Sequence, residues 1–136
     1  MRALFLALPL GLAVCGNPQP FDPEIEVSLE EPFALRVAQS AEVATTGLRI
    51  RFDGVRDDSR CAVDVTCVWA GNARVQLTVD VDDEVEQLEL NTTLDPQDVD
   101  VNGFSVALQR LQPENRSGVT IEPDDYVATL QVTRAP

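Results

Sequence analysis

The chain has 136 residues, and 23 acidic side chains against ten arginines give it a formal net charge of −13 at pH 7. It contains no lysine and no histidine, which excludes Ser-His-Asp and Cys-His catalysis and any lysine Schiff base. The negative charge disfavours binding to nucleic acid or to an anionic membrane surface, and the length is that of one domain.

The first fifteen residues have the pattern of a signal peptide. Arg2 precedes a run over residues 3–14 that is apolar except for Pro9 and Gly11. Such a run is too short to cross a bilayer, which takes about 20 apolar residues, but it has the length of a signal-peptide core. A buried helix is the alternative, which the proline and the glycine disfavour. We therefore assign residues 1–15 to a signal peptide.

The end of this run, Leu12-Ala13-Val14-Cys15, resembles the lipobox of bacterial lipoproteins. The resemblance implies that Cys15 is acylated and becomes the mature N-terminus, which anchors the protein to a membrane of the cell envelope. Val14 departs from the pattern, because Gly, Ala or Ser usually precedes the cysteine. Cleavage after Gly16, giving a soluble periplasmic or secreted protein, is the alternative.

The segment after the signal differs in composition from the rest of the chain. Residues 16–31 include Pro18, Pro20 and Pro23, which predicts a flexible Pro-rich tether. Residues 32–136 show no further shift in composition and no internal repeat, and we assign them to a single β domain.

The domain has the alternation of apolar and polar residues that is typical of strands with one buried face. The clearest strands are predicted at residues 33–37, 48–53, 74–81, 104–109 and 126–133. Weaker strands are predicted at residues 42–45, 67–70 and 84–91, the last with a bulge near Glu86-Gln87. Turn pairs such as Asp82-Asp83 and Asn102-Gly103 separate the strands. Seven or eight short strands predict an antiparallel β-sandwich of immunoglobulin or fibronectin-III type, with a small β-barrel as second choice.

Two aromatic residues carry further expectations. Tyr126 lies at the start of the last strand and resembles the tyrosine corner of immunoglobulin and fibronectin-III domains, which implies a hydroxyl bonded to upstream backbone. Trp69, two residues after Cys67, is predicted to be a core aromatic packed on a disulfide. A sugar-stacking platform is the alternative for this side chain.

With Cys15 assigned to the anchor, Cys61 and Cys67 remain. In an exported chain this favours one disulfide, and closing so short a ring contributes about 2–2.5 kcal/mol to stability. A zinc site would need more ligands, and the C-x-x-C spacing of redox proteins is absent. Free thiols are the remaining alternative.

The segment from Asp58 to Ala73, DSRCAVDVTCVWAGNA, is the most distinctive in the chain. It resembles a recurring group of small, uncharacterised bacterial exported proteins and lipoproteins, whose shared segment reads D-S-R-C-P and then C-[VI]-W-A-G. Ala62 stands where that group usually has proline. The resemblance extends from Phe33 to Val132, and it implies a cellular location and a fold class but no activity.

Two interpretations of this segment remain open. It is either a structural knot, oriented by an ion pair among Asp57, Asp58 and Arg60, or a rigid recognition loop on the sandwich. The candidate residues of the recognition loop are Asp58, Arg60, Trp69 and Asn72.

The sequence contains no constellation that favours catalysis. A glycosidase needs two carboxylates at a set separation, and nothing singles out such a pair among the acids in the predicted turns. No G-x-S-x-G motif is present. Asp95, Asp98 and Asp100 offer carboxylates for calcium, but they lack the glycine and distal glutamate of an EF-hand. We therefore expect no enzymatic activity, metal or cofactor.

The leading hypothesis is a non-enzymatic envelope module with an unknown protein partner. The alternative is a secreted inhibitor of a basic hydrolase such as a lysozyme or protease. From Gly16 onward all 23 acidic residues and nine of the arginines remain, a formal charge of −14, and that field would speed encounter with a cationic enzyme. A hydrolase that uses paired carboxylates is the third and weakest hypothesis.

Overall fold

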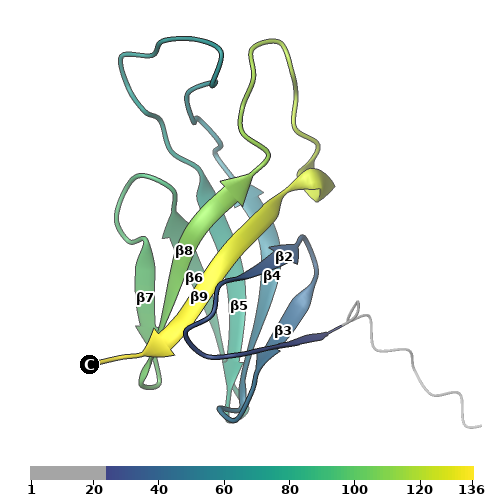
Figure 1. The fold of residues 1–136 in the computed structure, drawn as a ribbon, viewed down its shortest axis with the longest axis vertical. Helices are drawn as coiled ribbons and strands as arrows, with labels where there is room; N and C mark the ends of the chain where they lie inside the picture. Colours follow the sequence, from purple (N-terminus) through teal and green to yellow (C-terminus); the bar gives the residue numbers. More distant parts are fainter. Residues whose placement is uncertain (1–23) are drawn as a thin grey trace, which may run out of the picture.

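Nine strands in two sheets form the part of the chain that the structure describes, residues 24–136 of a computed structural model (Figure 1). One sheet has the order β1-β3-β4-β5-β6 and the other β2-β9-β8-β7. The strands are β1 (Ile25–Val27), β2 (Phe33–Arg36), β3 (Ser40–Val43), β4 (Leu48–Arg56), β5 (Arg74–Val81), β6 (Glu84–Asn91), β7 (Asp98–Val101), β8 (Phe104–Gln112) and β9 (Val127–Arg134), with a 3-10 turn at Pro123–Asp125. The sheets do not close into a barrel, so the predicted β-sandwich is confirmed.

The core lies between the two sheets, where the alternating side chains of the strands meet. Every second residue of β5 is buried, as are the inward positions of β4 and β9. Because polar residues fill most of the other positions, one face of each strand packs and the other meets water. The buried side chains of these three strands are Leu48, Ile50, Phe52, Val75, Leu77, Val79, Val81, Ala128, Leu130 and Val132.

The two ends of the sandwich have connections of different lengths. At one end, two-residue turns join β5 to β6 and β7 to β8 (Figure 1). Both residues of each turn have positive φ, at 50° and 65° for Asp82-Asp83 and 46° and 83° for Asn102-Gly103, as in the type I′ hairpin turn. At the other end lie the β4–β5 loop (residues 57–73), the β6–β7 loop (residues 92–97) and the β8–β9 loop (residues 113–126).

Two of the sequence-based predictions about strands are wrong. The predicted tether reached residue 31, but Ile25–Val27 forms β1, which pairs in parallel with β3. Residues 67–70 form no strand and belong to the β4–β5 loop. This loop extends past the sheets, so a short apolar run there has no neighbouring strand with which to pair.

The predicted bulge at Glu86-Gln87 is also absent, because β5 and β6 pair without a break in register. The slip in alternation arises because Val85 faces solvent on the edge strand β6, whereas Leu88 is buried. The shifts in register lie elsewhere, between Phe52 and Gly54 and between Leu108 and Arg110.

The predicted signal peptide, including Cys15, lies outside the described residues, as does the tether up to residue 23. Across residues 24–136, no helix has the length and the apolar character that crossing a membrane requires.

Candidate functional site

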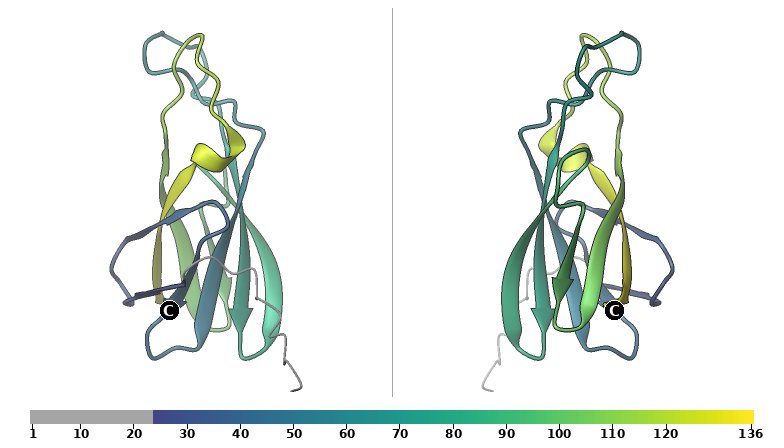
Figure 2. Two further views of the ribbon diagram at one scale, coloured as in Figure 1. Left: turned by 90° about the vertical axis from the view of Figure 1, so that its right-hand side faces the viewer. Right: turned by 90° about the vertical axis from the view of Figure 1, so that its left-hand side faces the viewer.

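The β4–β5 and β8–β9 loops project side by side beyond the sheets (Figures 1 and 2). The backbone N–H of Val63 donates to the carbonyl of Asn115 at 2.9 Å. The backbone N–H of Ser117 donates to the Asp64 carboxylate, also at 2.9 Å, and this bond lowers the pKa of Asp64 below its usual value. The two loops therefore support each other although more than fifty residues separate them in sequence.

The β4–β5 loop is an arm whose two sides are joined by hydrogen bonds and a disulfide. The N–H of Ser59 donates to the carbonyl of Asn72 at 2.7 Å, and the N–H of Cys61 donates to that of Ala70 at 2.9 Å. Further out, Cys61 and Cys67 form a disulfide with a Cα–Cα distance of 6.0 Å. The predicted disulfide is therefore confirmed, and it closes the outer part of the arm.

Gly71 permits the close approach of the two sides of this arm. Its φ is +69°, a conformation that residues with a Cβ rarely adopt. A Cβ at this position would lie 1.8 Å from the backbone oxygen of Ser59. Any other residue would therefore force the two sides of the arm apart.

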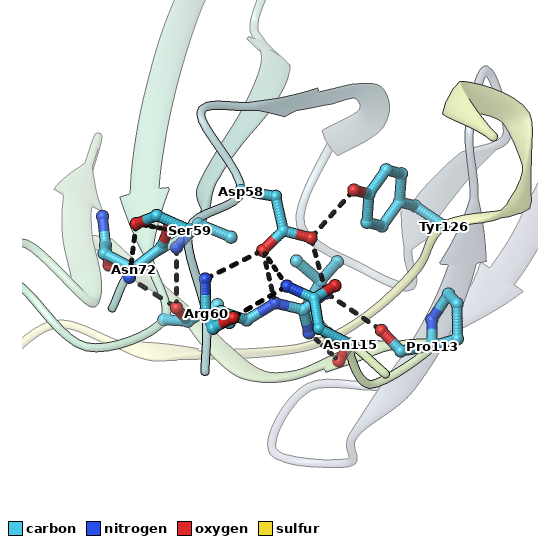
Figure 3. Close-up of polar contacts among 10 residues, drawn as sticks. Asp58, Ser59, Arg60, Asn72, Pro113, Asn115 and Tyr126 are labelled. Atoms are coloured by element: carbon cyan, nitrogen blue, oxygen red, sulfur yellow. Dashed lines mark hydrogen bonds and ion pairs between the residues drawn. The ribbon is translucent and has the colours of Figure 1, made fainter. Parts of the chain in front are cut away.

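Asp58 is the centre of a polar cluster at the base of the arm (Figure 3). Its carboxylate accepts hydrogen bonds from Arg60 Nε and Nη2, each at 2.8 Å, so the pair is bidentate. The two side chains are only 10% and 13% exposed. Charge-assisted bonds of this geometry are among the strongest in proteins, and the predicted ion pair between these residues is confirmed.

The same carboxylate joins the β8–β9 loop to the arm. Tyr126 Oη donates to Asp58 Oδ2 at 2.8 Å, and Asn115 Nδ2 donates to Oδ1 at 3.2 Å (Figure 3). The guanidinium of Arg60 in turn donates to the carbonyls of Leu111 and Pro113, each at 2.9 Å. Asp58 and Arg60 therefore hold the end of β8, the β8–β9 loop and the start of β9 in one arrangement.

Tyr126 differs from the expected tyrosine corner. The resemblance implied a bond from its hydroxyl to upstream backbone, but the acceptor is the Asp58 carboxylate, 68 residues earlier. Burial and this bond raise the pKa of Tyr126 to about 12. Burial acts to raise the pKa of Asp58 as well, but the bonds from Arg60 and Tyr126 outweigh it and place that pKa below its usual value.

Asn72 connects the arm to the third long connection, the β6–β7 loop. Its Nδ2 donates to Asn91 Oδ1 at 2.9 Å, and its Oδ1 accepts from the backbone N–H groups of Thr93 and Leu94 at 3.0 and 3.2 Å. This side chain therefore satisfies backbone donors of the neighbouring loop, which is a structural role.

Asp57 has a different partner from the one predicted. It pairs with Arg74 on β5 at 2.6 Å rather than with Arg60, and its side chain is 71% exposed. The hydrogen bonds of Arg74 to Glu89 and to Asp57 raise the pKa of the arginine. This surface pair stands beside the buried one between Asp58 and Arg60.

The prediction that Trp69 belongs to the core is wrong, because the side chain is 82% exposed. The arm carries it beyond both sheets, where no core residue reaches it. Val68 is 91% exposed, and further exposed valines lie on the same arm and on the β8–β9 loop. We call this set the apolar tip: Val63, Val65, Val68, Trp69 and Val119.

The predicted recognition residues therefore separate into two groups. Asp58, Arg60 and Asn72 form the supporting framework, and Trp69 alone stands on the outer surface. Asn115 also belongs to the framework. The sequence does not predict this role, because no local motif distinguishes the residue.

The acidic residues are not arranged as a metal site in the part of the chain that the structure describes. Across residues 24–136, no group of three or more His, Cys, Asp or Glu side chains is placed to hold a metal ion, and this includes Asp95, Asp98 and Asp100. What the loops offer chemically is an exposed apolar surface on a support that is held by hydrogen bonds and a disulfide.

Comparison with family models, with curated proteins and with solved structures gives no match for this chain.

Proposed function

We propose that this protein is a non-enzymatic binding module of a bacterial cell envelope, held at a membrane through acylated Cys15, and that the apolar tip is its contact surface. The observation that carries the proposal is the exposure of Trp69 and Val68, at 82% and 91%, on a braced arm. Exposed apolar patches mark interaction sites, and tryptophan is enriched in protein interfaces.

The framework beneath the tip supports this function. Within residues 24–136, every buried polar side-chain atom has a hydrogen-bond partner, and a fully satisfied polar network rigidifies what it holds. The disulfide and Gly71 restrict the arm further. A rigid loop loses little conformational entropy on binding, so more of the contact energy appears as affinity.

The proposed location rests on the sequence around Cys15 and on the disulfide. Leu12-Ala13-Val14-Cys15 resembles a lipobox, and the bond between Cys61 and Cys67 fits an oxidising compartment outside the cytoplasm. Two or more acyl chains are enough for stable attachment to a membrane. The resemblance of the segment from Asp58 to Ala73 to bacterial exported proteins supports the same location.

The anchor is tested by cell fractionation of the full-length protein and its Cys15→Ser variant. We expect the wild type in the membrane fraction and the variant in the soluble fraction or as unprocessed precursor. A mature N-terminus at Asn17, determined by mass spectrometry, would overturn the anchor and leave a soluble exported protein.

The contact surface is tested by immobilising wild-type protein and two variants and exposing them to envelope extract. Trp69→Ser removes the largest side chain of the apolar tip. Val85→Ser is the matched control, because Val85 is 64% exposed but lies beside the two-residue turn after β5. We expect Trp69→Ser alone to lose the retained proteins. Equal retention by all three would exclude the tip as the contact surface.

A further inference from the structure

The apolar tip and a concentration of negative charge occur at the same end of the molecule. The three long connections, residues 57–73, 92–97 and 113–126, carry eight acidic residues and two arginines, a formal charge of −6. The pair of Asp58 and Arg60 is internally neutral, and Asp57 pairs with Arg74 at the start of β5. The excess therefore comes from the other six acids of these loops against Arg116, a formal charge of −5. Any molecule that touches the tip therefore also meets a negative field.

The shape of this end further restricts what can bind there. The two loops stand out beyond the sheets in perpendicular views (Figures 1 and 2), and Val68 and Trp69 are almost fully exposed on the arm. A projecting apolar surface is best buried in a concave one. Aromatic side chains that fill a pocket at the centre of an interface usually supply most of its binding energy.

Two occupants are disfavoured by charge. A second copy brings the same negative field and the same projecting surface, so two copies repel and bury little area against each other. An anionic lipid surface is repelled for the same reason. A positively charged protein is attracted, and the field would increase its rate of association.

We infer that the partner is a cationic protein with an apolar cleft that receives Trp69 and Val68, an inference that rests on the proposed function. The arm supplies the apolar anchor, and the acids of the three loops supply the complementary charge around it. A basic hydrolase whose substrate cleft is filled by the arm is one member of this class.

The test places a photocrosslinker at the tip of the full-length protein in its own cells. Benzoylphenylalanine replaces Val68 in one variant and Val85 in the control, since both side chains are exposed but lie at opposite ends of the sandwich. After irradiation, mass spectrometry identifies the adduct. The affinity of the protein for the isolated partner is then measured at about 0.1 M and about 1 M salt. Between these concentrations the Debye length falls from about 10 to about 3 Å.

We expect the crosslinker at position 68 to form an adduct with a protein that has a net positive charge at neutral pH. We expect no adduct from the crosslinker at position 85. The yield of the adduct at position 68 should fall about tenfold or more when Trp69→Ser is added, as for an interface anchor, and binding should weaken at the higher salt. A partner of neutral or negative charge, binding insensitive to salt, an adduct with lipid or an adduct with a second copy would overturn the inference while leaving the tip as a contact surface. No adduct at Val68 would overturn the proposed function itself.

Discussion

The two ends of the sandwich keep their shape by different means. The Asp82-Asp83 and Asn102-Gly103 turns are each set by two residues with positive φ, so their conformation depends on adjacent residues. The long loops at the other end are held by Asp58, Arg60 and Tyr126, which come from the start of the first loop and the end of the last. One end therefore depends on local sequence, and the other on contacts between residues distant in the chain.

Among the contacts that hold the long loops, the largest expected effect is at the buried ion pair of Asp58 and Arg60. Asp58→Ala removes the charge that neutralises the largely buried Arg60 guanidinium, which keeps only carbonyl acceptors, and it removes the acceptor of the Tyr126 hydroxyl. We expect the free energy of unfolding, measured by urea denaturation with circular dichroism, to fall by about 3 kcal/mol. The control is Asp57→Ala, whose exposed pair with Arg74 contributes little. Equal losses in the two variants would show that burial does not distinguish the pairs.

The disulfide is expected to have the next largest effect. Replacing both Cys61 and Cys67 by alanine removes the constraint on the unfolded chain, and the unfolding free energy should fall by about 2–2.5 kcal/mol. The variant should still fold, because the core between the sheets does not involve the bridge. A variant that fails to fold would show instead that the arm is required for the sandwich to form.

Tyr126→Phe tests the link between the last strand and the arm. Loss of one bond to a charged acceptor should cost about 1.5–2 kcal/mol at neutral pH. The folded state raises the pKa of Tyr126 to about 12, so its contribution is complete below the unfolded value of about 10 and is lost as the pH rises toward 12. In the variant this alkaline loss should disappear.

The lowered pKa of Asp58 predicts the opposite behaviour in acid. Its contribution is complete above the unfolded value of about 4 and is lost as the pH falls below it. Tyr126→Phe removes one of the bonds that lower this pKa, so the acid-dependent part of the stability should shrink.

Tyr126 is the sole tyrosine of the chain, so phenolate absorbance follows its titration directly. A midpoint near 10 in the folded protein would contradict the bond to Asp58.

The fold was largely predictable because its strands have one buried and one solvated face. Residues such as Leu48, Ile50 and Phe52 alternate with polar neighbours, and this period is a property of each strand alone. The pattern of the edge strand β6 wrongly predicts a bulge, because Val85 is apolar but faces water. The local sequence does not distinguish an exposed apolar residue in a regular strand from a break in register.

The framework of the loops was predictable only where its partners are close in sequence. Cys61 and Cys67, and likewise Asp58 and Arg60, lie within six residues of each other. The bond of Tyr126 to Asp58 spans 68 residues, and no periodic pattern predicts such a contact. Trp69 is predicted to lie in the core because large aromatics usually do. It is exposed instead, because the arm carries it beyond the two sheets that enclose the core.

Substitutions in the two-residue turns should change the unfolding free energy only slightly, and backbone conformation predicts the direction of each change. Asp83 has a φ of 65°, and type I′ turns favour glycine at the second position. Asp83→Gly should raise the unfolding free energy by about 0.5 kcal/mol, and Gly103→Asp, at the equivalent position of the other turn, should lower it by about 0.5 kcal/mol. Changes of the same sign in both variants, measured by thermal denaturation, would show that tertiary contacts and not backbone conformation govern these turns.

The smallest effect on stability is expected at Trp69, the residue on which the proposed function depends. Its side chain is 82% exposed, so folding removes little of its surface from water, and Trp69→Ser should change the unfolding free energy by less than about 0.5 kcal/mol. Phe52→Ala, at a fully buried aromatic, should cost about 3–5 kcal/mol.

Trp69 is also the sole tryptophan. Its fluorescence in the folded protein should already have the emission maximum of a solvated indole and should shift little on unfolding. A strong red shift on unfolding, or a loss in Trp69→Ser as large as that in Phe52→Ala, would place the side chain in packed surroundings and remove the apolar tip as a binding surface.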